Sequence, residues 1–300
     1  MKVIDNIVDR LRQYIIRRLD QPVETYERRV YNNLRHLYKY IRKGDVVLVE
    51  GRSEISRIIK LLSQSHWSHS ALYVGDELIK RHRPDREKYL EQFGEDARHL
   101  VIEAFPSTGV IASPLRKYID YNIRVCRPYG IHKKDLQIVI EDVISNLGKQ
   151  YDQENIIDIA LMLLPGWFNR FKPRSVRARL GSGDEFQVIC SGMIARAFQR
   201  VCYPIVPVLV PPSENGDKVS SPYGAGLLMR HYTQILPRDF DLSPNFEIIK
   251  FNIIKAGKFR YRELPWEAAE PEEDLPRCGT TPRSPFLPEI EPKNRKKSAD

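Results

Sequence analysis

The stretch WSHSALYVGD, residues 67–76, predicts a β-strand from His69 to Val74 that is closed by a Gly-Asp turn. In an extended strand successive side chains point to opposite faces, so His69 shares one face with Ala71 and Tyr73. A histidine just inside a strand is rigidly aimed, which suits a general base. The sequence therefore predicts a strand here with His69 as a candidate base. The alternatives are a surface or capping role for His69, and His66, which precedes the strand, as the base.

A short apolar run around one acidic residue is the second feature. The stretch LVIEAF, residues 100–105, surrounds Glu103 with side chains that favour a buried strand. A buried carboxylate must be paired or it costs several kcal/mol, and an imidazolium is a natural partner. A carboxylate on a neighbouring strand would fix the tautomer and orientation of His69. The alternative is an edge-strand glutamate that faces water.

The third feature is Cys190, which lies in a stretch, residues 187–201, that predicts a helix with this cysteine in its first turn. The peptide dipoles at a helix N-terminus favour thiolate over thiol, so the pKa of a cysteine there falls. Free backbone N–H groups in the same turn are also able to hold an oxyanion. The alternative is a small buried hydrophobe, the commonest fate of a lone cysteine.

The hydrophobic pattern predicts the other elements. Further strands are predicted over residues 45–49, 99–105, 110–112, 123–126 and 246–254. Further helices are predicted over residues 3–19, 25–41, 53–63, 133–147 and 156–167, with Ser53 as an N-cap. Residues 77–98 are charged and poorly periodic, so we expect an insertion there.

Charge and composition limit the setting of the protein. The 300 residues carry a formal net charge of +9, which attracts anionic lipid or nucleic acid. Residues 3–19 predict a basic amphipathic helix, packed either on the domain or on an anionic membrane or partner. No stretch reaches the ~20 apolar residues of a membrane span, and Asp5 and Asp9 interrupt any signal-peptide run. Four cysteines without a zinc-like spacing favour a reducing compartment, so we expect a cytoplasmic protein with peripheral membrane contact through residues 3–19 as an open alternative.

Together these segments resemble the permuted branch of the NlpC-type papain-like superfamily, in particular the YiiX/YebB-like proteins. The resemblance covers residues 43–254. It rests on GDVVL (44–48), WSHSAL (67–72), VIEA (101–104), Gly109-Val110, GKQYD (148–152), Cys190-Ser191 and PRDF (237–240). In ordinary papain-like enzymes the cysteine precedes the histidine, whereas here the order is His, Glu, Cys, as in the permuted branch. The long interval from His69 to Glu103, and Ile189 where relatives commonly carry an aromatic residue, depart from the family pattern.

The resemblance implies an α+β fold, a circularly permuted papain-like (NlpC-type) domain with a small antiparallel sheet or barrel packed on helices. We expect an N-terminal helical extension over residues 1–42, this catalytic domain over residues 43–260 and a disordered Pro-rich tail over residues 261–300. The resemblance implies a nucleophile at Cys190, a base at His69 and an orienting acid at Glu103. It also implies a tyrosine near the site, for which Tyr232 and Tyr223 are the candidates. Substrate contacts are expected from Trp67, Ser68, Tyr151, Ser191 and Tyr232.

The expected function is a cysteine hydrolase or acyltransferase that cleaves an amide, ester or thioester through a thioester on Cys190. The substrate is expected to be a small-molecule, peptide or lipid-like acyl compound, and the Arg-rich loop over residues 170–179 favours an amphiphilic or anionic one. No cofactor and no metal are expected, because His66 and His69 have no second pair of ligands nearby. The alternatives are a non-catalytic ligand- or membrane-binding module on the same fold, and a nucleic-acid binder, for which the basic segments carry no accompanying motif.

Overall fold

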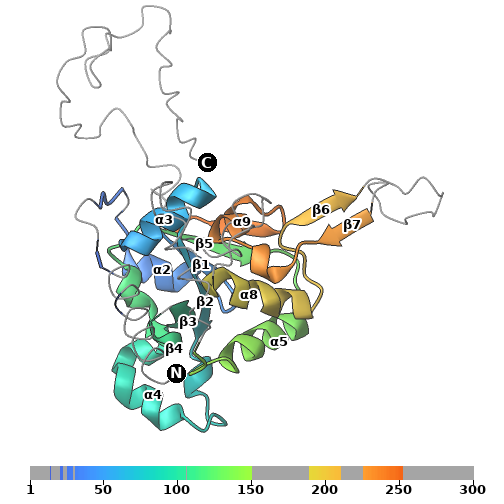
Figure 1. Ribbon diagram of the computed structural model, residues 1–300. Coiled ribbons are helices and arrows are strands. Elements are labelled where there is room, and N and C mark those ends of the chain that lie inside the picture. The colour runs from blue at the N-terminus through green and yellow to red at the C-terminus, as the bar shows by residue number, and fades with distance from the viewer. Residues whose placement is uncertain are drawn as a thin grey trace, which may run out of the picture. The chain divides into compact units, whose positions relative to one another are not determined.

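The strand that begins at His69 lies inside a six-stranded antiparallel sheet with the order β4-β3-β2-β1-β5-β8 (Figure 1). The computed structural model describes residues 14, 21–22, 26–29, 31–105, 107–150, 189–210 and 226–252. The sheet consists of β1 (Val46–Val49), β2 (His69–Gly75), β3 (Leu100–Phe105), β4 (Gly109–Pro114), β5 (Ile123–Pro128) and β8 (Phe246–Ile249). A separate two-stranded sheet pairs β6 (Pro207–Val210) with β7 (Gly226–Met229).

Helices connect and cover these strands. The α-helices are α2 (Leu34–Tyr40), α3 (Glu54–Ser63), α4 (Arg86–Phe93), α5 (Lys133–Ile144), α8 (Ile189–Arg200) and α9 (Pro237–Leu242). Short 3-10 turns are η1 (Glu77–Ile79), η2 (Gly94–Arg98), η3 (Leu115–Tyr118) and η5 (Tyr232–Gln234). Helices and antiparallel strands therefore make an α+β architecture, as the sequence predicted.

Local chemistry explains where two of these elements begin. The turn before β1 contains Gly44, whose φ is +88° and whose missing Cβ would lie 2.3 Å from Leu136 Cδ1. Only glycine meets both conditions, because a side chain there would be strained and would collide with α5. At α3 the predicted N-cap is confirmed, since the Ser53 side chain accepts the N–H of Ser56 at 3.3 Å.

Three sequence predictions were wrong in extent. The helix expected over residues 25–41 is helical only as α2, because Asn33 caps it by accepting the N–H of His36. Residues 77–98, expected as an insertion without assigned elements, contain η1, α4 and η2, whose few apolar side chains gave a weak periodic signal. The last strand ends at Ile249 rather than at residue 254. The helices expected over residues 3–19 and 156–167 lie outside the described residues, apart from helical Tyr14.

Alternation along the strands sorts the apolar side chains onto two faces of the sheet. On one face the core joins β2 and β3 to α5 and α8, and includes Leu72, Val74, Ile102, Val139, Ile194 and Phe198. On the other face the core joins the same strands to α2 and η3, and includes Leu37, Ala71, Tyr73, Val101, Leu115 and Tyr118. The sheet is therefore covered on both sides, and α8 packs on the face opposite to that of Ala71.

The chain divides into two compact units, Met1–Asn252 and Ile253–Asp300, and all described residues lie in the first. No helix among the described residues is long and apolar enough to cross a bilayer.

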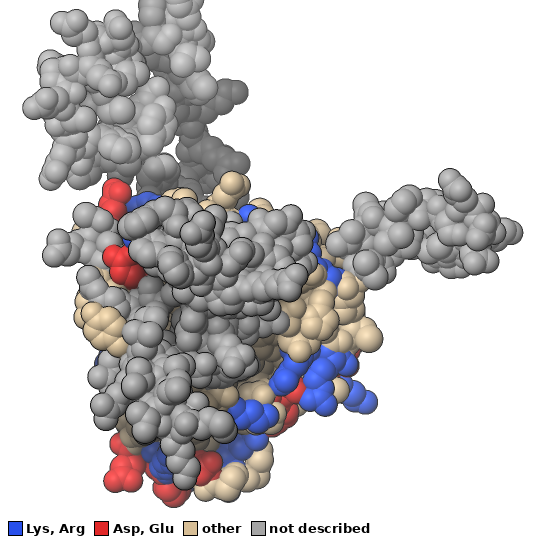
Figure 2. Space-filling view, viewed as in Figure 1, with Lys and Arg blue, Asp and Glu red and all other residues tan. Residues whose placement is uncertain are grey.

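Figure 2 shows basic side chains gathered on the face where α5 lies in Figure 1. The basic residues of α5 and α8 are Lys133, Lys134, Arg196 and Arg200. Buried Asp142 accepts from Arg200, and its Oδ2 lies 3.6 Å from Arg196 Nη2, so two of these charges are partly balanced.

Candidate active site

His69 occupies the point where β2 separates from β3. The register between these strands begins with Ala71 opposite Glu103, so His69 and Ser70 pair only with β1 there, through Val49 and Leu48. By alternation His69 points to the face of Ala71, whereas Ser70 points to the face on which α8 packs. The His69 and Ser70 side chains therefore leave the start of β2 on opposite faces of the sheet.

Glu103 lies beside His69 and is fully buried. Its Oε2 is 2.8 Å from His69 Nε2 and also accepts the hydroxyl of Tyr118, while Lys117 Nζ donates to Oε1 at 2.9 Å. Burial alone would raise the pKa of this carboxyl, but hydrogen bonds and charge from His69 and Lys117, with a further hydrogen bond from Ser113, lower the pKa to about 2. Glu103 is therefore a carboxylate at neutral pH, and it leaves Nδ1 of the imidazole free for another partner.

That other partner is Cys190. It is the second residue of α8, its side chain is buried, and it forms a side-chain hydrogen bond with His69. Burial raises the pKa of the thiol, but the charge of His69 and hydrogen bonds from His69 and Ser70 bring the pKa below its usual value. The structure thus places the sulfur and the imidazole in contact, although 121 positions separate them in the chain.

The pKa of the His69 imidazole shifts upward, whereas that of the Cys190 thiol shifts downward. Burial lowers the pKa of His69, but the Cys190 thiolate and the Glu103 carboxylate raise it to about 9. A low thiol pKa beside a high imidazole pKa favours a thiolate–imidazolium pair at neutral pH. Such a pair contains an activated nucleophile and a proton donor for a leaving group.

Aromatic rings and a lysine fix the imidazole from the side. Phe105 stacks on the His69 ring with centroids 4.8 Å apart and planes at 16°. Lys117 Nζ lies 4.5 Å from the Phe105 ring while it donates to Glu103. Burial and the neighbouring carboxylate raise the pKa of Tyr118 well above its usual value, so its hydroxyl stays protonated as a donor to Glu103. These contacts hold the His69 imidazole and the Glu103 carboxylate in one position.

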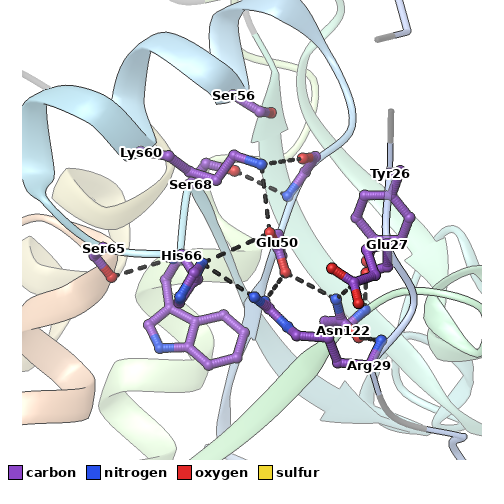
Figure 3. A network of polar contacts seen from close by, with 12 residues as sticks. Tyr26, Glu27, Arg29, Glu50, Ser56, Lys60, Ser65, His66, Ser68 and Asn122 are labelled. Carbon is purple, nitrogen blue, oxygen red and sulfur yellow. Dashed lines mark hydrogen bonds and ion pairs between the residues drawn. The ribbon is translucent and has the colours of Figure 1, made fainter. Parts of the chain in front are cut away.

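A second polar network holds the turn that leads into β2 (Figure 3). Buried Glu50 follows β1 and accepts from Arg29, from Asn122 Nδ2 at 2.8 Å and from Lys60 Nζ at 3.4 Å. His66 Nδ1 lies 3.8 Å from Glu50 Oε1 and 3.3 Å from Arg29 Nη1, on the solvent side of this network. His66 therefore faces Glu50 and Arg29, and the imidazole that faces the thiol is that of His69.

The residues expected to touch the substrate have the following positions. Ser68 is buried and its Oγ accepts the N–H of Gly51 at 2.9 Å, where a Cβ on Gly51 would lie 2.9 Å from that oxygen. Trp67 Nε1 donates to Asp241 Oδ2 at 2.9 Å. Ser191 Oγ donates to Ile235 O at 2.6 Å. Tyr232 lies in η5, which packs against α8, and its carbonyl oxygen is 3.5 Å from the position of a Cβ on Gly192.

Two further candidates, Tyr151 and Tyr223, lie outside the described residues. For Trp67, Ser68 and Ser191 the structure shows bonds that fix the local chain, and their contact with a substrate stays a prediction. Sequence reasoning missed four groups around the triad, namely Ser70, Phe105, Lys117 and Tyr118. The alternation of side chains along β2 already placed Ser70 on the face opposite to His69, whereas nothing in the local pattern distinguishes Lys117 and Tyr118 from other polar and aromatic residues.

Among the residues that the structure describes, no three His, Cys, Asp or Glu side chains gather closely enough to hold an ion. The only pair of histidines considered from the sequence is divided between two networks, His66 with Glu50 and His69 with Glu103.

Comparison with known proteins bears out the resemblance over part of the chain. Residues 40–158 match a family described as permuted papain-like amidase enzymes, the YaeF/YiiX or C92 family. The match includes His69 and Glu103 and ends before Cys190. No curated protein matches the chain. A solved structure described as the metalloprotein YiiX from Escherichia coli O157:H7 is similar, with 17% identity, a TM-score of 0.40, and coverage of 70% of this chain and 97% of that one.

Proposed function

We propose, from the match to the permuted papain-like amidase family, that this protein hydrolyses an amide through a thioester on Cys190. The coarse assignment, a hydrolase of the papain-like amidase type, follows from the match itself. The identity of the nucleophile rests on the geometry of this chain, because the matched residues end at 158. The observation that carries the proposal is the contact of the Cys190 thiol with the His69 imidazole, whose Nε2 is held 2.8 Å from Glu103.

The geometry supports a two-step acyl transfer. The Cys190 thiolate attacks the carbonyl carbon, and the carbonyl oxygen becomes an oxyanion beside backbone N–H groups of the first turn of α8. The intermediate collapses as the imidazolium of His69 gives its proton to the leaving amine, which breaks the C–N bond and leaves a thioester. Neutral His69 then takes a proton from water, the hydroxide attacks the thioester, and the acid leaves as the thiolate–imidazolium pair returns.

Glu103 supports both steps without giving or taking a proton. Its pKa of about 2 keeps it ionised, so it holds the imidazole in one orientation and stabilises the charged form that precedes each proton transfer. Esters and thioesters have better leaving groups than amides, so the same site is expected to accept them. Transfer of the acyl group to an acceptor other than water requires only that the acceptor replace water in the second step.

The test compares wild type with Cys190→Ala and with Cys126→Ala on a panel of peptide amide, lipid ester and thioester substrates. Cys126 is the matched control because it is also a buried free cysteine, on β5, and burial raises its pKa. We expect Cys190→Ala to lose turnover by about 10³-fold or more, and Cys126→Ala to retain it. Mass spectrometry of a slow ester reaction should find the acyl group on Cys190.

Equal turnover by wild type and Cys190→Ala would remove the proposed nucleophile. The alternative from another class, a non-catalytic binding module on this fold, predicts a different result. In that case the wild type would turn over no substrate of the panel, and ligand binding would survive Cys190→Ala.

A further inference from the structure

Ser70 is a buried hydroxyl that the triad does not explain. Its side chain is fully buried, and its Oγ has no hydrogen-bond partner of regular geometry among the described residues, although it lies near the Cys190 sulfur. Leaving a hydroxyl unpaired inside a protein costs free energy comparable to that of a lost hydrogen bond. Most buried polar groups are satisfied, so an unpaired one beside a reactive group points to a role in the chemistry.

The fold aims this hydroxyl at the nucleophile. Ser70 lies on β2 next to His69, and alternation turns its side chain to the face of Leu72 and Val74, on which α8 packs. Because the register between β2 and β3 begins only at Ala71, no β3 residue pairs with Ser70. The group beside it is Cys190, whose pKa is lowered by both the hydroxyl and the backbone N–H of Ser70.

We propose that Ser70 is a further catalytic residue, whose hydroxyl donates a hydrogen bond to the Cys190 sulfur whenever that sulfur is a thiolate. The inference rests on the proposed role of Cys190 as nucleophile. The hydroxyl has no other hydrogen-bond partner among the described residues, it lowers the pKa of the Cys190 thiol, and a charged acceptor makes a hydrogen bond roughly twice as strong as a neutral one. The hydrogen bond from Ser70 is therefore strongest when the sulfur is a thiolate.

The hydrogen bond serves both steps of the reaction. Before acylation it adds to His69 in holding the sulfur ionised. When the S–C bond forms, the sulfur loses its charge and the bond from Ser70 is released without any transfer of a proton. When the thioester breaks, the charge returns to the sulfur, and the same hydroxyl stabilises the leaving thiolate.

The titratable groups that face the sulfur come from three elements. His69 on β2 contacts it directly, Glu103 on β3 acts through His69, and the pKa of Tyr118 on η3 feels the charge of Cys190. The Ser70 hydroxyl, unlike these groups, does not titrate in the pH range of the experiment. Its effect is therefore separable from that of His69, because its loss changes no charge.

The experiment measures the rate of iodoacetamide reaction with Cys190 as a function of pH in wild type, Ser70→Ala, Ser70→Thr and Ser243→Ala. Ser243 is the matched control, since it is a buried serine whose hydroxyl bonds to Ile205 O away from the site. Cys190→Ala provides the background reaction. We expect Ser70→Ala to move the acid limb of the profile to higher pH and to slow the reaction about tenfold below that limb. Ser70→Thr, which keeps the hydroxyl, should restore most of the rate, and Ser243→Ala should match wild type.

Folding is checked by circular dichroism and thermal unfolding. Because the hydroxyl has no other partner, Ser70→Ala is expected to be as stable as wild type, and Ser70→Gly replaces it in the test if it does not fold. A profile of Ser70→Ala that superimposes on that of a reactive wild type would overturn the role of Ser70 alone. A wild type whose Cys190 is not reactive at low pH would instead overturn the activation of Cys190.

Discussion

Lys117 Nζ and His69 Nε2 bind opposite oxygens of one buried carboxylate, at 2.9 Å and 2.8 Å from Glu103. The negative charge that stabilises the imidazolium is therefore shared with a lysine that is about one-third exposed to solvent. Because Lys117 also binds the carboxylate, Glu103 raises the pKa of His69 less than it would alone. A weaker hold on the His69 proton favours catalysis, since the imidazolium must give that proton to the leaving group.

Removing the lysine should strengthen the hold on that proton. In Lys117→Met the carboxylate loses a competing cation, so the pKa of His69, already raised to about 9, should rise further. The alkaline limb of the kcat/KM profile should move to higher pH, and the rate at neutral pH should fall a few fold. Lys80→Met is the matched control, because Lys80 is similarly exposed and binds buried Glu77 at 2.7 Å. An alkaline limb that stays in place in Lys117→Met would contradict the charge sharing.

Replacing Glu103 should lower the pKa of His69, whereas replacing Lys117 should raise it. Glu103→Gln keeps the shape of the side chain but removes the charge that raises the pKa of His69, so the alkaline limb should move to lower pH. The imidazolium and the thiolate are both less stabilised, and kcat/KM should fall about 10²-fold. Steady-state kinetics from pH 5 to pH 10, about the range in which histidine and cysteine titrate, measure both effects.

The control for that substitution is Glu77→Gln, which also neutralises a buried glutamate bound by lysines. It should cost stability and leave the pH limits of activity unchanged. Identical pH limits in wild type and Glu103→Gln would show that Glu103 does not set the charge of His69.

The same carboxylate makes stability depend on acidity. Its pKa is lowered from 4.5 to about 2 in the folded protein, so ionised Glu103 stabilises the fold fully above pH 4.5. This contribution should be lost as the pH falls from 4.5 through 2. Urea unfolding over that range should show a loss on the order of 3 kcal/mol in wild type. Glu103→Gln should lack this part of the slope, and parallel curves for the two proteins would count against the paired carboxylate.

The network around Glu50 is expected to support stability rather than chemistry. Glu50→Gln leaves the cations of Arg29 and Lys60 without their buried counter-charge, and should lower the free energy of unfolding by about 2 kcal/mol. The exposed pair of Glu54 and Arg57 gives the control, since Glu54→Gln should cost about 0.5 kcal/mol or less. Equal urea midpoints for the two variants would show that the network does not hold the turn before His69.

Sequence patterns alone located the strands of the sheet. The strand over residues 69–74, the strand around Glu103 and the cap at Ser53 all appear in the structure within a residue or two. These signals are local, because strand alternation and helix caps depend on residues a few positions apart. Where the local signal was weak, as in α4 and in the short strands β6 and β7, the sequence predictions were incomplete.

The sequence by itself determined the types of groups available for chemistry and their places on elements: His69 on a strand, Glu103 in an apolar run and Cys190 in the first turn of a helix. Only the tertiary structure decided that they meet. The meeting depends on the pairing of β2 with β3 and on the packing of α8 against both strands. The roles of Lys117, Tyr118 and Ser70 depend on the same long-range packing, and a charge or hydroxyl carries no local sign of the partner it will reach.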